Sequence, residues 1–258
     1  MAAGPGVNLL IERMEFAGGA RVFDGLQLSV APGEVLALVG ASGVGKTTLL
    51  RIIGGMETGF AGRVTVGGVP AVAAPVPGFV FQDARLLPWL TVAQNILAVS
   101  PDLSHARIAQ LLAQVGLDGL QASYPHQLSG GMQRRLGLAR AISVNPGLLL
   151  LDEPFVSLDR AVVKELQAWV SRIFAEVRPT AILVSHDPED AARLADRVVI
   201  LAGRPARVAA DFRLPKGPGQ AERSALEVAQ VVDLIERAGQ AGAAMTGAAP
   251  AEMPVQFR

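Results

Sequence analysis

The feature that most constrains the fold is a glycine-rich segment between an apolar run and a helical pattern. Residues 40–47 read Gly-Ala-Ser-Gly-Val-Gly-Lys-Thr and match the pattern G-x-x-x-x-G-K-[ST] at every position. Residues 34–39 before it are mostly aliphatic, as in a buried strand, and residues 47–53 begin a helix that Gly54 and Gly55 end. A strand, a glycine loop and a helix in this order predict an α/β fold whose loop wraps an anion.

Each part of this loop suits a phosphate group. Gly40, Gly43 and Gly45 let the backbone turn tightly and approach phosphate oxygens, and the helix N-terminus adds unpaired amides. Lys46 would bring a full charge to the β- and γ-phosphates, and the Thr47 hydroxyl would ligate Mg²⁺. The alternative is a glycine-rich turn with a solvated lysine. The residues predicted to bind nucleotide here are Gly40, Ala41, Ser42, Gly43, Val44, Gly45, Lys46, Thr47 and Thr48.

A second anion-binding segment begins at Leu128, with the sequence Leu-Ser-Gly-Gly-Met-Gln. Ser129 stands at the N-cap of a helical pattern, and Gly130 and Gly131 permit close approach by a ligand. An ordinary capped helix would show the same three residues. We do not expect one chain to use both of its own loops on the same nucleotide, so we expect two copies of the chain, head to tail, each completing the site of the other.

The full string from Leu128 to Ala141, Leu-Ser-Gly-Gly-Met-Gln-Arg-Arg-Leu-Gly-Leu-Ala-Arg-Ala, resembles the signature motif of the ATP-binding-cassette (ABC) family. The resemblance covers about residues 8–210. It implies an α/β fold: a P-loop NTPase core with an antiparallel β subdomain and an inserted α-helical subdomain at about residues 86–143. We therefore expect an ABC ATPase domain over residues 8–214.

The segment 215–258 is expected to lie outside that domain. Apolar residues near helical spacing predict a helix over residues 221–238. From Gly239 onward the sequence is rich in alanine, and we expect a disordered tail.

Two further apolar runs end in polar residues. Asp152 and Glu153 follow residues 148–151, and His186 follows the strand-like residues 180–185. The resemblance assigns Asp152 to Mg²⁺, Glu153 to the general base for the attacking water, and His186 to contact with the γ-phosphate. Adjacent acids could instead cap a turn, and a lone histidine is usually structural. Because ligands bind at the carboxyl ends of parallel strands, we expect all three near the glycine loop.

Three other segments gain a role from the resemblance. Gln82 resembles the Q-loop glutamine, which touches the metal and water site and whose loop contacts membrane subunits. Phe16 matches the aromatic residue that stacks on adenine, although Phe23 leaves the register open and Phe16 could be a core side chain. Residues 157–159 resemble the D-loop along the dimer seam. The predicted catalytic residues are thus Glu153, His186 and Gln82, and the predicted metal ligands are Thr47, Gln82 and Asp152.

The segment 81–92, Phe-Gln-Asp-Ala-Arg-Leu-Leu-Pro-Trp-Leu-Thr-Val, resembles the Q-loop region of the nitrate, sulfonate and taurine importer group, and residues 124–127 and 152–155 are similar to it. This implies an ATP-hydrolysing subunit that energises uptake of a small anionic solute through a separate permease, with a solute-binding protein acting indirectly. The permease would dock near Gln82–Trp89, where residues 86–89 form an apolar patch, unless they fill the subdomain core. The alternatives are an ABC exporter subunit, a soluble non-transport ABC ATPase, or a nucleotide-binding module without turnover.

Composition fits these expectations. The chain has 258 residues, which suits one domain with a smaller subdomain. Its 23 basic residues balance 23 acidic ones, so no nucleic-acid partner is expected, and it lacks cysteine for disulfides or thiolate metal sites. It has neither an apolar run of about 18 residues nor a recognisable signal peptide. We expect ATP and Mg²⁺ as cofactors and a peripheral location on the cytoplasmic side of the inner membrane.

Overall fold

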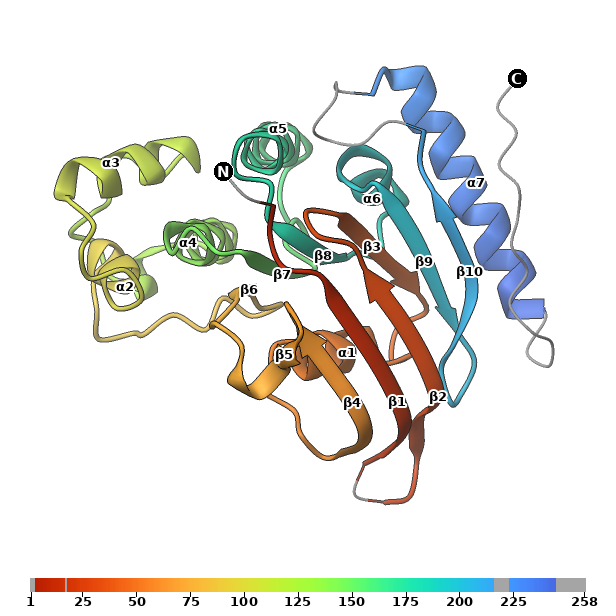
Figure 1. The fold of residues 1–258 in the computed structure, drawn as a ribbon. Coiled ribbons are helices and arrows are strands. Elements are labelled where there is room, and N and C mark those ends of the chain that lie inside the picture. The colour runs from red at the N-terminus through yellow and green to blue at the C-terminus, as the bar shows by residue number, and fades with distance from the viewer. Residues whose placement is uncertain (1–2, 17, 216–222, 245–258) are drawn as a thin grey trace.

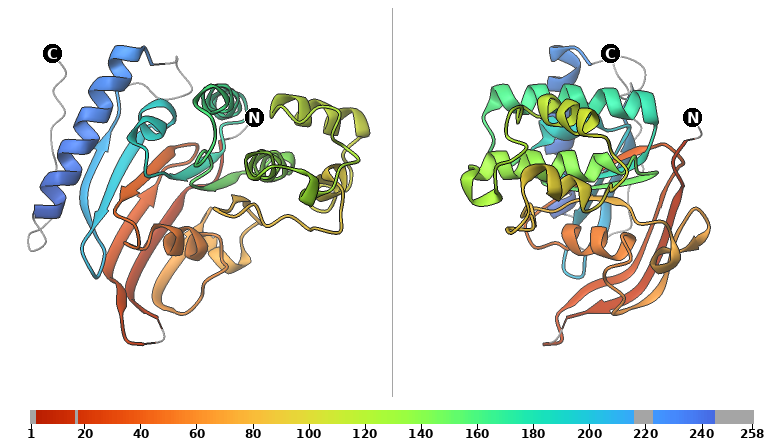
Figure 2. Two further views of the ribbon diagram at one scale, coloured as in Figure 1. Left: turned by 180° about the vertical axis from the view of Figure 1, so that it is seen from behind. Right: turned by 90° about the vertical axis from the view of Figure 1, so that its left-hand side faces the viewer.

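Two β-sheets enclose one helix, and a group of three helices stands to one side of them (Figure 1). The computed structural model describes residues 3–16, 18–215 and 223–244. The left view of Figure 2 shows the same separation from behind: the helical group lies at one end of the molecule and the last helix at the other.

The strands are β1 (Val7–Glu15), β2 (Arg21–Val30), β3 (Val35–Gly40), β4 (Phe60–Val66), β5 (Val69–Pro70), β6 (Gly78–Val80), β7 (Leu148–Asp152), β8 (Thr180–Val184), β9 (Arg197–Ala202) and β10 (Arg207–Arg213). The α-helices are α1 (Lys46–Ile53), α2 (Val92–Leu97), α3 (His105–Gln114), α4 (Gly130–Ser143), α5 (Arg160–Val177), α6 (Pro188–Leu194) and α7 (Ala225–Ala244). Two 3₁₀ turns occupy Ala71–Ala73 and Pro125–Gln127.

The larger sheet has the strand order β10-β9-β3-β8-β7-β6, in which only β10 pairs antiparallel to its neighbour. The smaller sheet is antiparallel, with the order β2-β1-β4-β5. In the larger sheet β3, β7 and β8 run parallel, so their carboxyl ends meet at one edge. This edge brings together Gly40, Asp152 and the turn that follows Val184.

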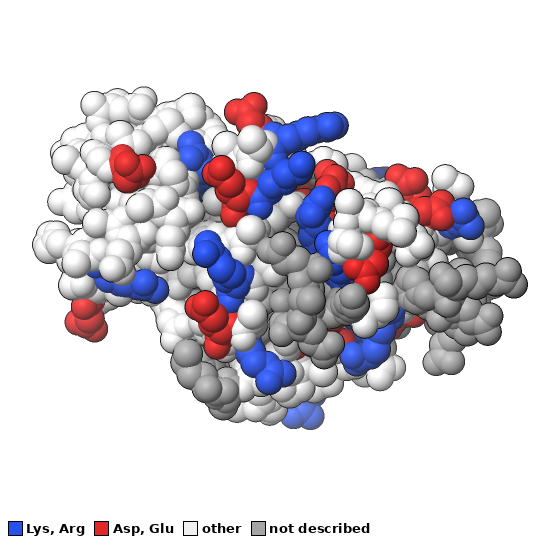
Figure 3. Space-filling view, turned by 90° about the horizontal axis from the view of Figure 1, so that it is seen from above, with Lys and Arg blue, Asp and Glu red and all other residues white. Residues whose placement is uncertain are grey.

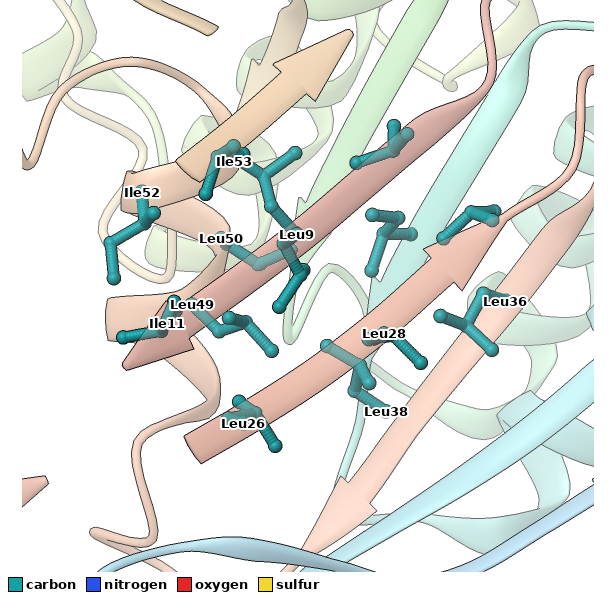
Figure 4. Packing of buried hydrophobic residues seen from close by; sticks show 14 of the residues in the cluster. Leu9, Ile11, Leu26, Leu28, Leu36, Leu38, Leu49, Leu50, Ile52 and Ile53 are labelled. Carbon is teal, nitrogen blue, oxygen red and sulfur yellow. The ribbon is translucent and has the colours of Figure 1, made fainter. Parts of the chain in front are cut away.

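The side chains of β7 point alternately into two separate layers of the hydrophobic core. Leu148 and Leu150 join the cluster that contains α1, whereas Leu149 and Leu151 join the cluster that contains α3, α4 and α5. Because successive side chains of a strand point to opposite faces, α1 and α4 cover opposite faces of the parallel sheet. Figure 4 shows the first layer. Its labelled side chains from β1, β2, β3 and α1 are Leu9, Ile11, Leu26, Leu28, Leu36, Leu38, Leu49, Leu50, Ile52 and Ile53.

The antiparallel sheet, the parallel core and the helical group confirm the predicted α/β fold class. Helices α2, α3 and α4 all lie within residues 92–143. None of the helices in the described part of the chain combines the length and apolar character needed to cross a bilayer.

The predicted end of the C-terminal helix was wrong. Helix α7 begins after Ser224, whose hydroxyl accepts from the amide of Glu227 at 3.3 Å, and it continues through Gly239 to Ala244. Buried Val231 and Ile235 hold it against α6, β9 and β10, and the alanine-rich sequence after Gly239 has high helix propensity. The tail beyond residue 244 and residues 216–222 lie outside the described residues.

Candidate active site

The glycine loop joins β3 to α1 in a conformation that other residues rarely adopt. Gly43 and Gly45 have φ angles of 75° and 112°. A Cβ atom on Gly45 would lie 2.9 Å from the ring of Phe23, so the loop excludes side chains here for two reasons. Gly45 is also the N-cap of α1 and makes no side-chain cap, which leaves the first amides of the helix available to an anion.

The Lys46 ammonium group lies inside the curl of this loop. Its Nζ donates to the carbonyl oxygens of Gly40 at 2.7 Å and Ala41 at 3.1 Å. Burial lowers the pKa of Lys46, whereas the nearby carboxylates of Glu153 and Asp152 raise it. The loop therefore holds a cation close to the position where an anion would meet the helix N-terminus.

Thr47 and Asp152 offer two oxygen atoms side by side. The Thr47 hydroxyl donates to Asp152 Oδ1 at 3.1 Å, although the two residues lie in α1 and β7. Burial raises the pKa of Asp152, and the hydrogen bond from Thr47 acts in the opposite direction. Within the described residues no cluster of three or more His, Cys, Asp or Glu side chains could hold a metal ion. A hydroxyl and one carboxylate fit Mg²⁺, which keeps water ligands and also binds substrate phosphates.

Glu153 and His186 face each other across the ends of two strands. Glu153 Oε2 lies 3.6 Å from His186 Nδ1, and the histidine side chain is 60% exposed. Glu153 has a φ of 51°, a left-handed conformation that costs about 1 kcal/mol or more in a residue with a side chain. Its amide donates to the carbonyl of Val184 at 2.9 Å, which ties this turn to β8.

A cavity of about 400 Å³ joins several of the predicted residues. It is lined by the end of the glycine loop from Ser42 to Thr48, by Phe16, by Gln82 and by Glu153. Phe16 is 50% exposed. Phe23 is fully buried beneath Gly45 and lies outside the cavity lining. The geometry therefore favours Phe16 over Phe23 as the residue that a bound ring would meet.

His186 lines two neighbouring cavities rather than this one. One, of about 640 Å³, includes Gly40, Ala41 and Ser42 from the glycine loop, and the other, of about 370 Å³, includes Glu153. Two arginines that the sequence analysis missed, Arg21 and Arg204, line the 400 Å³ cavity. Both stand in segments without a recognisable motif, so no sequence signal pointed to them.

The signature segment lies elsewhere. Ser129 and Gly130 are exposed at the N-terminus of α4, where the Ser129 hydroxyl accepts from the amide of Met132 at 3.3 Å. Neither the 400 Å³ cavity nor the 640 Å³ cavity includes Ser129, Gly130 or Gly131. Within one chain the two predicted anion-binding segments are thus separate.

A glycine loop at the end of a parallel strand, with Lys46, Thr47 and two carboxylates beside it, defines a P-loop nucleoside triphosphatase site. The sequence profile described as ABC transporter matches residues 23–156, and the chain belongs to this family. The match confirms the resemblance drawn from the signature motif.

Three known proteins show how far the similarity extends. The aliphatic sulfonates import ATP-binding protein SsuB 1 of Xanthomonas axonopodis pv. citri is 43% identical over 233 residues, which cover 87% of this chain and 91% of the relative. The aliphatic sulfonates import ATP-binding protein SsuB of Bacillus subtilis is 41% identical over 209 residues, covering 78% and 82%. A solved dimeric ATP-binding cassette, bound to ADP and phosphate after hydrolysis, has a TM-score of 0.73 at 26% identity and covers 81% of this chain and 99% of its own.

Proposed function

We propose that this chain is the ATP-hydrolysing subunit of an ABC importer that energises uptake of an aliphatic sulfonate or a similar small anion. The importer assignment and the solute rest on relatives named for aliphatic sulfonate import, which are 41–43% identical over most of their length. The observation that carries the ATPase role is the meeting of Lys46, the Thr47–Asp152 pair and the Glu153–His186 pair at one sheet edge. The chain would act as a peripheral protein on the cytoplasmic side of the inner membrane.

Each residue at this edge has a defined task in hydrolysis. The loop amides and Lys46 bind the phosphates, and Phe16 stacks on adenine. Thr47, Asp152 and Gln82 would hold Mg²⁺, which when bound neutralises charge on the β- and γ-phosphates. Glu153 accepts a proton from the attacking water, and His186 contacts the γ-phosphate.

A second copy of the chain supplies the remaining ligands. Ser129, Gly130 and Gly131 of one copy cover the nucleotide held by the glycine loop of the other. The exposure of Ser129 and Gly130, and the position of all three residues outside the 400 Å³ and 640 Å³ cavities, support this arrangement. The structurally similar cassette bound to ADP and phosphate is itself dimeric.

A permease would dock on the segment Gln82–Trp89, and the structure supports this with an outward-facing tryptophan. Trp89 is 70% exposed, whereas Leu86 and Leu87 are half-buried, so only part of the predicted apolar patch fills the subdomain core. Two side chains of the helical group hold this segment by hydrogen bonds to its backbone. Arg140 of α4 donates to the carbonyls of Ala84 at 2.8 Å and Arg85 at 3.0 Å.

The second of these side chains is that of Asn95, which is fully buried in α2. Its amide bonds to the backbone of residues 87, 90 and 91. A rigid loop with an exposed aromatic side chain costs little conformational entropy when it binds a partner. Figure 3 looks at the molecule from above, where basic and acidic side chains are interspersed and are fewer at the end where the helical group lies. An apolar helix of a permease fits the exposed Trp89 side chain, and the solute-binding protein would act through that permease.

The dimer and the catalytic base are tested with Glu153→Gln. With ATP and Mg²⁺ we expect the purified variant to elute as a dimer and to hydrolyse ATP at least about 100-fold more slowly than the wild type. Adding Ser129→Arg should return it to a monomer that still binds nucleotide. Glu165→Gln, an exposed glutamate of α5, is the matched control and should leave both properties unchanged. Hydrolysis by Glu153→Gln at the wild-type rate, or a stable dimer of the double variant, would refute the proposal.

The solute is tested by growth. Cells without this gene should fail to grow on ethanesulfonate as the only sulfur source and should recover with the wild-type gene, whereas the Glu153→Gln gene should not restore growth. Unimpaired growth of the deletion strain would contradict the solute assignment while leaving the ATPase role intact.

A further inference from the structure

A buried carboxylate with no role in the proposed mechanism of ATP hydrolysis lies close to His186. Asp190, in α6, is 5% exposed. Its Oδ1 accepts from Gln167 Nε2 at 2.7 Å, and its Oδ2 accepts from the hydroxyl of Ser185 at 2.6 Å. Both donors are also buried. A carboxylate in such a place is costly to ionise, and burial raises the pKa of Asp190 to about 6.

The hydrogen bonds continue from Asp190 to the turn that carries His186. The Ser185 hydroxyl, which donates to Asp190, also accepts from the amide of Asp187 at 3.0 Å. Asp187 in turn caps α6, because its Oδ1 accepts from the amide of Glu189 at 2.8 Å. The backbone on both sides of His186 is therefore fixed by side chains that lie beneath it.

His186 depends on this support because its own side chain is mostly exposed. Its imidazole has 60% of its surface open, and its contact with Glu153 is 3.6 Å long. A ring so weakly enclosed takes its position from its backbone. Ser185 is the last residue before His186, so movement of the Ser185 hydroxyl would move the imidazole relative to Glu153.

We propose that Asp190 is a positioning residue for hydrolysis: through Ser185 it fixes the turn that holds His186 beside Glu153. Gln167 fixes Asp190 in turn and links this turn to α5, the helix that begins directly after residues 157–159. The 370 Å³ cavity is lined by residues of all these segments, from Ser157 to Gln167 and from Ser185 to Asp190. The inference rests on the role proposed for His186.

The test compares Asp190→Asn, Ser185→Ala and the double variant in ATPase assays of the purified protein. A displaced imidazole should lower kcat by about 10-fold to 100-fold, because small misplacements of a catalytic group carry costs of this order. The affinity for ATP should remain within about twofold, since the glycine loop is untouched. If Asp190 acts through Ser185, the double variant should be no slower than Ser185→Ala alone. Glu189→Gln, one residue earlier and exposed, is the control and should keep the wild-type kcat.

Two further variants separate the possible failures. Gln167→Met keeps the hydrogen bond between Asp190 and Ser185, and it serves as the milder change if Asp190→Asn folds poorly. It should lower kcat by a smaller factor than Asp190→Asn does, again without weakening ATP binding. His186→Ala tests the proposed function itself, and wild-type kcat in that variant would refute the role of His186. The positioning inference is overturned if His186→Ala is slow while Ser185→Ala and Gln167→Met keep the wild-type kcat. It is also overturned if the effects of Asp190→Asn and Ser185→Ala on kcat multiply in the double variant.

Discussion

Asn95→Leu tests how the segment before α2 is held in place. The asparagine is fully buried, and its side chain bonds to four backbone groups: Oδ1 accepts from the amide of Leu87 at 2.8 Å, and the two hydrogens of Nδ2 are shared among the carbonyls of Leu87, Leu90 and Thr91 at 3.0–3.1 Å. Leucine has the same branching and no polar atoms, and its methyl groups are larger than the amide oxygen and nitrogen that they replace, so the substitution removes these bonds and leaves no empty space.

The cost follows from which backbone groups lose their partner. The carbonyl of Leu87 still accepts from the amide of Leu90, and that of Thr91 still accepts from the amide of Asn95. The Leu87 amide and the Leu90 carbonyl have no other partner in the described part of the chain. Two unsatisfied groups at about 1–3 kcal/mol each give about 2–6 kcal/mol, and burial of the leucine side chain offsets about 2 kcal/mol of this. We expect a net loss of about 2 kcal/mol in the free energy of unfolding.

The measurement is urea unfolding followed by circular dichroism and by tryptophan emission. Coincident transitions and an unchanged slope with urea would show that the midpoint reports stability alone. Gln94→Ala is the matched control: Gln94 is exposed, and its side chain only completes a capping box with Thr91, so its loss should stay below about 1 kcal/mol. A loss for Asn95→Leu that is no larger than for the control would mean that water replaces the lost bonds, and the reasoning about a rigid docking loop would fail.

Two other predictions concern stability. Gly62→Ala should lower the free energy of unfolding by about 3 kcal/mol, because the new Cβ would lie 2.1 Å from the carbonyl oxygen of Leu10 and Gly62 has a φ of 130°. Gly68→Ala should lower it by only about 1 kcal/mol, because Gly68 has a φ of 85° but its new Cβ would lie in open space. Equal losses for the two variants would contradict the steric argument. Because burial raises the pKa of Asp190 from an ordinary 3.8 to about 6, its contribution to stability should fall as pH rises from about 4 to about 6, by at most about 3 kcal/mol. Unfolding measured against pH should therefore show wild-type stability falling relative to Asp190→Asn in this window, and a constant difference would refute the shift.

The sequence by itself determined the parts of the site that local backbone chemistry encodes. A loop with glycines where φ is positive, followed by Lys46 and Thr47 at a helix start, can be recognised without knowing what surrounds it. The same holds for Ser129 at the N-terminus of α4 and for Asp152 at the end of an aliphatic strand. These patterns predicted the fold class and the family because each specifies its own backbone conformation over a few residues.

Only the tertiary structure decided which side chains are exposed and which are buried. Phe16 and Phe23 look alike in the sequence, but Phe23 is buried beneath Gly45 while Phe16 lines the cavity. The contacts of Asp190 with Gln167 and of Arg140 with Ala84 join residues that are distant along the chain, and no local sequence pattern predicts them. Burial and long-range hydrogen bonds depend on how separate elements pack, which is a property of the folded chain as a whole.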